Sequence, residues 1–172
     1  MSQATEKLQK STVNLASQPL PFRHLLAAAH DFADSAGHAV LKYFRKPIAV
    51  ENKLGEGFDP VTAADRAAEK VIAKALRARF PDHALTGEEF GMVDGVSRYR
   101  WVVDPIDGTR AFIMGSPLWG TLIGLLDGET PLLGVMDQPF TGERFWSGEK
   151  SAHMRRAGGK AVTLKTRACP KL

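Results

Sequence analysis

Apolar residues recur every three or four positions in two stretches of the chain, which is the pattern of amphipathic helices. The first stretch runs from Phe22 to Arg45 and stops before Pro47. The second follows Thr62, a residue type that often caps a helix, and stops at Pro81. The apolar positions are Phe22, Leu25, Leu26, Ala29, Phe32, Ala33, Ala36, Val40 and Phe44 in the first stretch and Ala68, Val71, Ile72, Ala75, Leu76 and Phe80 in the second. We therefore predict two long helices.

The second half of the chain has shorter apolar runs, rich in β-branched and aromatic residues, which predict strands. An Asp-Gly pair at 127–128 is a strong hairpin signal between two of them. The polar segment 90–98 and the basic segment 148–160 predict loops. The predicted strands cover residues 48–53, 83–86, 101–103, 119–126, 132–136, 143–146 and 161–164. This order predicts a layered α+β fold with two long helices packed on a largely antiparallel sheet.

The composition is that of one soluble globular domain. Of the 172 residues, 44% are hydrophobic, and no apolar stretch approaches the roughly 20 residues needed to cross a bilayer. The net charge of +4 comes from scattered basic residues without interleaved aromatic residues, which argues against a nucleic-acid site. We therefore expect neither a membrane nor a nucleic acid as partner.

The single cysteine and the polar beginning of the chain both fit a cytoplasmic protein. Cys169 can form no internal disulfide, and it has no metal-ligand spacing, which suits a reducing compartment. Residues 1–20 lack the apolar core of a signal peptide. We expect them to form a flexible segment ahead of a folded domain at 21–172.

Two carboxylates lie three residues apart where a predicted strand meets a short helix. Asp104 follows the strand, and Pro105 is expected to end that strand because it has no backbone donor. Asp107 precedes a short helical stretch that begins at Gly108 and Thr109. Carboxylate oxygens suit Mg²⁺, and exposed amides at a helix start suit phosphate. The alternative is an ordinary strand-to-helix turn in which an Asp only caps the helix.

Further acidic residues precede this pair. Asp65 falls in the first turn of the second predicted helix, where a capping role is the simplest interpretation. Glu88 and its neighbour Glu89 follow a glycine at the end of a predicted strand. The glycine-rich loop at 55–57 lacks the Walker pattern, so we interpret it as a mobile flap. Three histidines show no paired-ligand pattern and are expected at the surface or the edge of the core: His24, His30 and His38.

Three segments together resemble the inositol-monophosphatase-like phosphatases, which are Mg²⁺-dependent and Li⁺-sensitive. They are Trp-Val-Val-Asp-Pro-Ile-Asp-Gly-Thr at 101–109, Gly-Glu-Glu at 87–89 and Asp-Pro-Val-Thr-Ala-Ala-Asp at 59–65. The resemblance implies the layered α/β sandwich of that family. It also implies a phosphomonoesterase that hydrolyses a small phosphorylated metabolite.

The resemblance also implies roles for individual residues around two or three Mg²⁺ ions. Glu88, Asp104 and the Ile106 carbonyl would hold the first ion, and Asp104 would bridge to a second ion held by Asp107. The expected catalytic residues are Glu88, Asp65 and Thr109, of which the last two would orient the attacking water. Backbone amides of Gly108 and Thr109 would receive the phosphate. Lys53, before the glycine-rich loop, would lie near the site.

Within the family, residues 107–125 and 133–139 resemble the histidinol-phosphatase branch, which serves histidine biosynthesis. Inositol monophosphatases more usually carry Thr-Asn-Phe after the Asp-Gly pair, where this chain has Thr-Arg-Ala-Phe at 109–112. The resemblance therefore implies a histidinol-phosphate phosphatase. The alternatives are an inositol monophosphatase and a broad sugar-phosphate phosphatase.

A second family signature, a Trp-Asp followed by small residues and Glu-Ala-Gly-Gly, is absent from the chain. In the family it supplies another metal-binding Asp, and neither Trp-Ser-Gly at 146–148 nor Ala-Gly-Gly at 157–159 contains one. We therefore expect the N-terminal two-thirds of an enzyme that is a homodimer at full length. The rival hypothesis is a catalytically dead fragment that binds metal without turnover.

Overall fold

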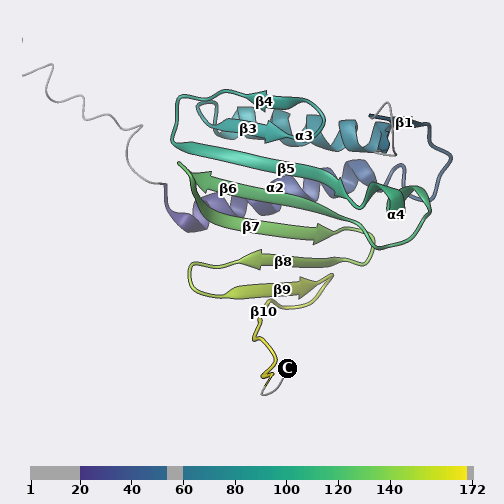
Figure 1. Cartoon of the computed structure of the whole chain (residues 1–172). Helices are drawn as coiled ribbons and strands as arrows, with labels where there is room; N and C mark the ends of the chain where they lie inside the picture. The colour runs from purple at the N-terminus through teal and green to yellow at the C-terminus, as the bar shows by residue number, and fades with distance from the viewer. Residues whose placement is uncertain (1–19, 54–59, 170–172) are drawn as a thin grey trace, which may run out of the picture.

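The computed structural model describes residues 20–53 and 60–169. The predicted flexible segment, apart from Leu20, lies outside the described residues, as do the glycine-rich loop at 55–57 and Asp59. In the described part, two long helices lie against one face of a sheet, as the sequence predicted (Figure 1). No described helix is both long and apolar enough to cross a membrane.

The first helix, α2 (Phe22–Val40), buries the predicted apolar stripe. It ends at Val40 and not at Arg45, so the predicted end was wrong. Beyond Val40 the chain tightens into a turn in which the Tyr43 N–H donates to the Val40 carbonyl at 2.9 Å. Arg45 then adopts a left-handed φ of 58°, which no helix can continue. Along α2, His24 and His38 are exposed and His30 is half-buried, as predicted.

The second helix, α3 (Ala63–Arg79), begins after Thr62, as predicted. The Thr62 hydroxyl accepts the Ala64 N–H at 3.1 Å, which satisfies one of the free donors at the helix start. Two acidic residues, Asp65 and Glu69, are buried on α3 along with its apolar stripe. Buried carboxylates need partners, and both find them near the candidate active site.

Eight strands form one sheet in the order β10-β9-β8-β7-β6-β5-β3-β4, and only the β3–β5 pairing is parallel. These strands are β3 (Ala84–Gly87), β4 (Gly91–Val93), β5 (Tyr99–Asp107), β6 (Gly120–Asp127), β7 (Thr130–Gln138), β8 (Glu143–Ser147), β9 (Ala152–Arg156) and β10 (Val162–Thr163). A separate antiparallel pair, β1 (Val50–Asn52) and β2 (Pro60–Thr62), precedes α3. The predicted Asp-Gly hairpin joins β6 to β7, with Gly128 at a φ of 60°.

Three details of the strand prediction were wrong. β4 and β9 lie inside segments predicted as loops. Both strands are polar or exposed, and they form because β3 and β8 offer unpaired backbone groups beside them. The third error concerns Pro105, which does not end β5, because the strand continues through a bulge to Asp107.

The core lies between the helices and the sheet, and Trp101 of β5 is at its centre. Its ring is fully buried and meets Phe32 of α2 edge-on at 5.1 Å between ring centroids. The indole N–H donates to Nδ1 of buried His83 at 3.0 Å. This hydrogen bond satisfies the polar atom of the tryptophan, while the ring contact with Phe32 packs β5 against α2.

A buried arginine ties α2 to the far half of the sheet. Arg144 of β8 donates to Asp137 of β7 and to Asp34 of α2, both at 2.7 Å. These residues line a pocket of about 420 Å³ that also includes Arg155. The two carboxylates compensate the charge of the buried guanidinium, and the cluster links α2 to β7 and β8.

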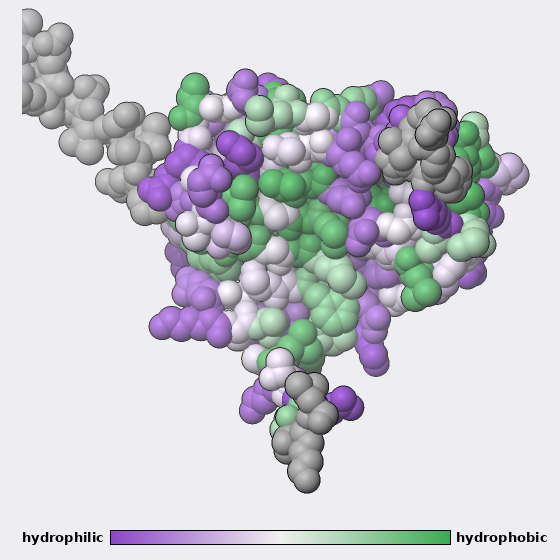
Figure 2. All heavy atoms as spheres, in the orientation of Figure 1, coloured by the Kyte–Doolittle hydropathy of each residue, from purple (hydrophilic) through white to green (hydrophobic). Residues whose placement is uncertain are grey.

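The sheet face opposite the helices carries no covering element in the described part of the chain. We call it the open face, and its members are Val102, Leu122, Gly124, Gly134, Met136 and Phe145. Val102 is 40% exposed and Met136 is 43% exposed. Figure 2 shows hydrophobic residues gathered in the middle of this face. A broad exposed apolar area of this kind usually marks an interaction surface.

Candidate active site

The bulge in β5 determines where the two central carboxylates lie. β5 pairs with β6 at Asp104–Leu122 and next at Asp107–Gly120, so three steps on β5 face two steps on β6. The extra residue makes a β-bulge, which re-aims the side chains around it. The buried Thr121 hydroxyl donates to the Pro105 carbonyl at 2.8 Å and holds the bulge in place.

The bulge leads into the short helix α4 (Thr109–Ile113) through Gly108. Gly108 has a φ of 93°, and a Cβ there would lie 2.8 Å from the Leu118 carbonyl oxygen, so only glycine fits. The Thr109 hydroxyl donates to the Ile106 carbonyl at 3.0 Å. The Ile106 N–H in turn donates to Oδ1 of Asp104 at 3.1 Å. These two hydrogen bonds link Asp104, Ile106 and Thr109 and so hold the backbone around the bulge.

The predicted metal ligands lie around one pocket of about 300 Å³. Its lining residues are Pro60, Glu88, Asp104, Ile106, Asp107, Gly108, Thr109 and Arg110. The structure therefore brings together Glu88, which follows β3, with the two aspartates of β5. It also brings the predicted phosphate-binding residues, Gly108 and Thr109, to the same pocket.

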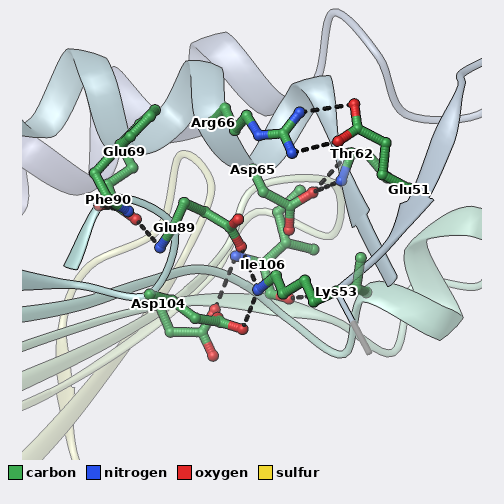
Figure 3. Close-up of polar contacts among 12 residues, drawn as sticks. Glu51, Lys53, Thr62, Asp65, Arg66, Glu69, Glu89, Phe90, Asp104 and Ile106 are labelled. Atoms are coloured by element: carbon green, nitrogen blue, oxygen red, sulfur yellow. Dashed lines mark hydrogen bonds and ion pairs between the residues drawn. The ribbon is translucent and has the colours of Figure 1, made fainter. Parts of the chain in front are cut away.

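Glu88 is held in position by a residue that the sequence analysis missed. The buried carboxylate of Glu69 on α3 accepts the backbone N–H groups of Glu89 at 2.7 Å and Phe90 at 3.0 Å (Figure 3). These two bonds fix the turn that carries Glu88. A sequence signal for Glu69 exists, because it follows Asp65 by four positions and thus lies on the same helix face.

Lys53, the residue after β1, lies between the two glutamates. Its Nζ is 2.9 Å from Oε1 of Glu88. The same nitrogen is 2.7 Å from Oε1 of Glu89 (Figure 3). Partial burial by itself would lower the pKa of Lys53, but the hydrogen bonds and charges of Glu89 and Glu88 together outweigh it and raise that pKa above its usual value. Lys53 therefore carries a positive charge at the site.

Asp65 has the capping role that its position suggested. Both the backbone N–H and the hydroxyl of Thr62 donate to its Oδ2, at 2.8 Å and 2.6 Å. Burial raises the pKa of Asp65, while the bonds from Thr62 and the charge of Lys53 oppose that change. Asp65 is not among the lining residues of the 300 Å³ pocket. Its expected part in orienting water stays a prediction.

Crowded negative charge is the main electrostatic feature of the pocket. Burial, a hydrogen bond shared with Glu88, and the charges of Glu88 and Asp107 together raise the pKa of Asp104 to about 7. Burial alone would raise the pKa of Glu88, but hydrogen bonds with Lys53 and Asp104 outweigh it and lower that pKa. A cation among these carboxylates would relieve their mutual repulsion.

Three carboxylates with a backbone carbonyl match the oxygen ligands that Mg²⁺ prefers. In the described part of the chain, however, no group of three or more His, Cys, Asp or Glu side chains is placed so as to hold a metal ion. The donor chemistry fits a divalent cation, whereas the positions do not yet form a complete site. Among these residues, Glu88 already has a cationic partner, because its Oε1 lies 2.9 Å from Nζ of Lys53.

Several known proteins with similar sequences are named as phosphatases. The sequence profile described as the inositol monophosphatase family matches residues 22–171. A chloroplastic bifunctional phosphatase of Arabidopsis thaliana is 41% identical over 148 residues, which cover 85% of this chain and 41% of that protein. A histidinol-phosphatase of Chlorobaculum parvum is 43% identical over 121 residues, covering 70% of this chain and 46% of that protein.

Solved structures support the fold. An inositol monophosphatase from Zymomonas mobilis superposes with a TM-score of 0.70 at 34% identity and covers 88% of this chain and 56% of that chain. The matched residues cover less than half of each of the two curated relatives, so the chain spans only part of their length. The predicted inositol-monophosphatase type of fold is confirmed.

Proposed function

This chain belongs to the inositol monophosphatase family, and on that premise we propose that it carries the first metal site of a Mg²⁺-dependent phosphomonoesterase. One observation supports the proposal most directly: Glu88, Asp104 and Asp107 line one pocket together with the start of α4. Acidic oxygen ligands beside backbone amides suit a cation and a phosphate in the same place. The family resemblance gives the expected number of ions as two or three.

The metal-binding residues of the proposal are those expected from the sequence. Glu88, Asp104 and the Ile106 carbonyl would hold one Mg²⁺, and Asp104 with Asp107 would hold a second. The Ile106 carbonyl already accepts the Thr109 hydroxyl, and its second lone pair is available to a cation. Bound Mg²⁺ would lower the pKa of a water molecule and neutralise charge on the phosphate.

The remaining residues of the proposal position the reactants. The Thr109 hydroxyl uses its hydrogen on the Ile106 carbonyl, so its oxygen is left to accept a hydrogen bond from a water molecule. Thr109 would thus orient the attacking water and would not be the nucleophile. Asp65 would share this task. Backbone N–H groups of Gly108 and Thr109 would donate to the phosphate oxygens.

For the substrate, we propose histidinol phosphate, with inositol monophosphate and sugar phosphates as alternatives. The support is the resemblance of residues 107–125 and 133–139 to the histidinol-phosphatase branch and the similarity to the Chlorobaculum parvum histidinol-phosphatase. The Zymomonas mobilis protein named as an inositol monophosphatase supports the alternative. Comparing kcat/KM for histidinol phosphate and inositol 1-phosphate decides between them, and a preference for the inositol ester would overturn the first.

A metal-binding domain without turnover is the rival proposal. It is favoured by the absence of the second family signature, which would supply a further metal-binding Asp, and by the share of the relatives that the chain spans. The test is phosphate release in millimolar Mg²⁺ by the 172-residue chain and by the same chain extended with the C-terminal part of a close relative. If only the extended chain releases phosphate, the 172-residue chain is a domain without turnover, as the rival states. If neither chain releases phosphate, the phosphatase proposal is contradicted.

A further inference from the structure

A positively charged side chain already forms ion pairs with two carboxylates at one side of the pocket. The ammonium of Lys53 lies 2.9 Å from Glu88 Oε1 and 2.7 Å from Glu89 Oε1. Asn52, the residue before it, pairs with Pro60 in the small sheet formed by β1 and β2. The backbone next to Lys53 is therefore held in the small sheet, and the long side chain of Lys53 places its ammonium at the edge of the pocket.

The two glutamates differ in how freely they can exchange a partner. The Glu89 side chain is only 4% exposed, and its backbone N–H is bound to Glu69 at 2.7 Å. The Glu88 side chain is 41% exposed and lines the pocket with Asp104 and Asp107. A buried carboxylate without a counter-charge is costly, so Glu89 needs Lys53 more than Glu88 does.

Building on the proposed role of Glu88 as a metal ligand, we propose that Lys53 is the resident counter-ion of Glu88 and that a divalent cation binds by displacing it onto Glu89 alone. The ammonium and a metal ion cannot share Glu88 Oε1 at bonding distance, because the two like charges would repel each other. Glu89 keeps the released lysine at the site. Lys53 thus lowers the affinity for metal, and when no metal is bound it neutralises part of the charge of the acidic cluster.

This proposal predicts an unusual direction of change. A lysine that only holds the Glu88 turn in place would, when removed, loosen that turn and weaken metal binding. A lysine that competes with the metal would, when removed, strengthen binding. Lys53→Met keeps most of the side-chain length and removes the charge, so the sign of its effect separates the two roles.

The experiment is calorimetric titration of Mn²⁺ into the full chain and its variants. We expect Lys53→Met to bind Mn²⁺ about fivefold more tightly than the unmodified protein, in line with the strength of a partly exposed ion pair. Lys53→Arg retains the charge and can bind both carboxylates, so its affinity should equal that of the unmodified protein or fall below it. Weaker binding by Lys53→Met would overturn the proposal.

The matched control is Arg66→Gln. Both terminal nitrogens of Arg66 bind Glu51, and this contact is the main cause that raises the pKa of Arg66, with smaller contributions from the charges of Glu89 and Asp65. Its removal changes the net charge as Lys53→Met does but frees no carboxylate of the pocket. We expect a change of less than about twofold. A gain in Mn²⁺ affinity equal to that of Lys53→Met would show that only the net charge matters. It would overturn the proposal that the metal displaces Lys53.

A double-mutant cycle ties the effect to Glu88. In a Glu88→Gln background, Lys53→Met should change the affinity for Mn²⁺ by less than about twofold, because the competing contact is already gone. An undiminished gain would overturn the proposal. If neither the unmodified protein nor Lys53→Met binds Mn²⁺, the proposed metal function itself fails. If both bind with equal affinity, the metal function stands and the role of Lys53 fails.

Discussion

A side chain on Gly87 and the carboxylate of Glu69 would occupy the same space. An ideal Cβ on Gly87 would lie 1.8 Å from Oε1 of Glu69 and 2.3 Å from its Cδ. Glycine at the end of β3 therefore lets a buried acid of α3 reach the backbone of the next turn, where it accepts the N–H groups of Glu89 and Phe90. The position of Glu88 in the pocket depends on this close approach.

We predict that Gly87→Ala will displace the Glu69 carboxylate and break its two backbone hydrogen bonds. Leaving these buried groups without partners should lower the free energy of unfolding by about 1–3 kcal/mol. Mn²⁺ binding should weaken as well, because the turn that carries Glu88 is no longer fixed. Urea unfolding and calorimetry measure the two effects.

The control for this substitution is Gly134→Ala in β7. A Cβ at Gly134 would meet no atom within 4 Å, and its φ is not in the left-handed region. We expect little change in stability or metal affinity. Equal losses in the two variants would contradict a special contact between Gly87 and Glu69.

We predict that Asp104→Asn will abolish detectable binding of Mg²⁺ and Mn²⁺. The substitution removes the charge of the residue proposed to bridge two ions, while the amide oxygen can still accept the Ile106 N–H. Calorimetry on the 172-residue chain measures the loss. Asp94→Asn, at an exposed position outside the pocket, is the matched control and should bind as before. Unchanged binding by Asp104→Asn would place the metal elsewhere.

We predict that stability will fall between pH 6.5 and pH 4 because of His83. Burial lowers the pKa of this histidine from 6.5 to about 4, while the nearby charge of Asp82 opposes that change only in part. In this range the unfolded chain binds a proton at His83 that the folded chain does not bind. The free energy of unfolding therefore falls as the pH falls. The loss should reach about 3 kcal/mol.

Replacing His83 by glutamine should reduce this pH dependence. Gln does not titrate, and its amide oxygen can accept the Trp101 N–H that His83 Nδ1 accepts in the structure. Urea unfolding at pH 7, 5.5 and 4.5 compares the two proteins. Parallel pH profiles would show that His83 contributes nothing to the acid sensitivity.

We predict that the 172-residue chain will self-associate through the open face. Met136 lies in the middle of that face and is 43% exposed, so Met136→Lys places a charge in any contact formed there. The variant should shift the protein toward monomer in sedimentation velocity. Val96→Lys, which adds the same charge at a loop residue that is 92% exposed, should not.

Extending the chain with the C-terminal part of a close relative should also shift the protein toward monomer. It should raise phosphatase activity as well. The added segment would cover the open face and, by the family resemblance, would supply the further metal-binding Asp. Equal turnover by a monomeric 172-residue chain would contradict both expectations.

The sequence by itself determined the local features of this protein. Helical periodicity placed α2 and α3, the Asp-Gly pair placed the β6–β7 hairpin, and Thr62 marked the start of α3. The motif at 101–109 fixed the order of the acidic residues and indicated the family. Each of these signals acts within a few residues, because helix and strand periods and turn geometry depend on near neighbours in the chain.

Only the tertiary structure decided the contacts that complete the candidate site. Lys53 meets Glu88 across 35 positions of sequence, and Glu69 meets the Glu89 N–H across 20. The bulge at Pro105 exists because β6 pairs on both sides of it and Thr121 holds its carbonyl. No local pattern specifies such contacts, because they arise when α3, β1 and β6 pack around the end of β5 and their buried polar groups must find partners there.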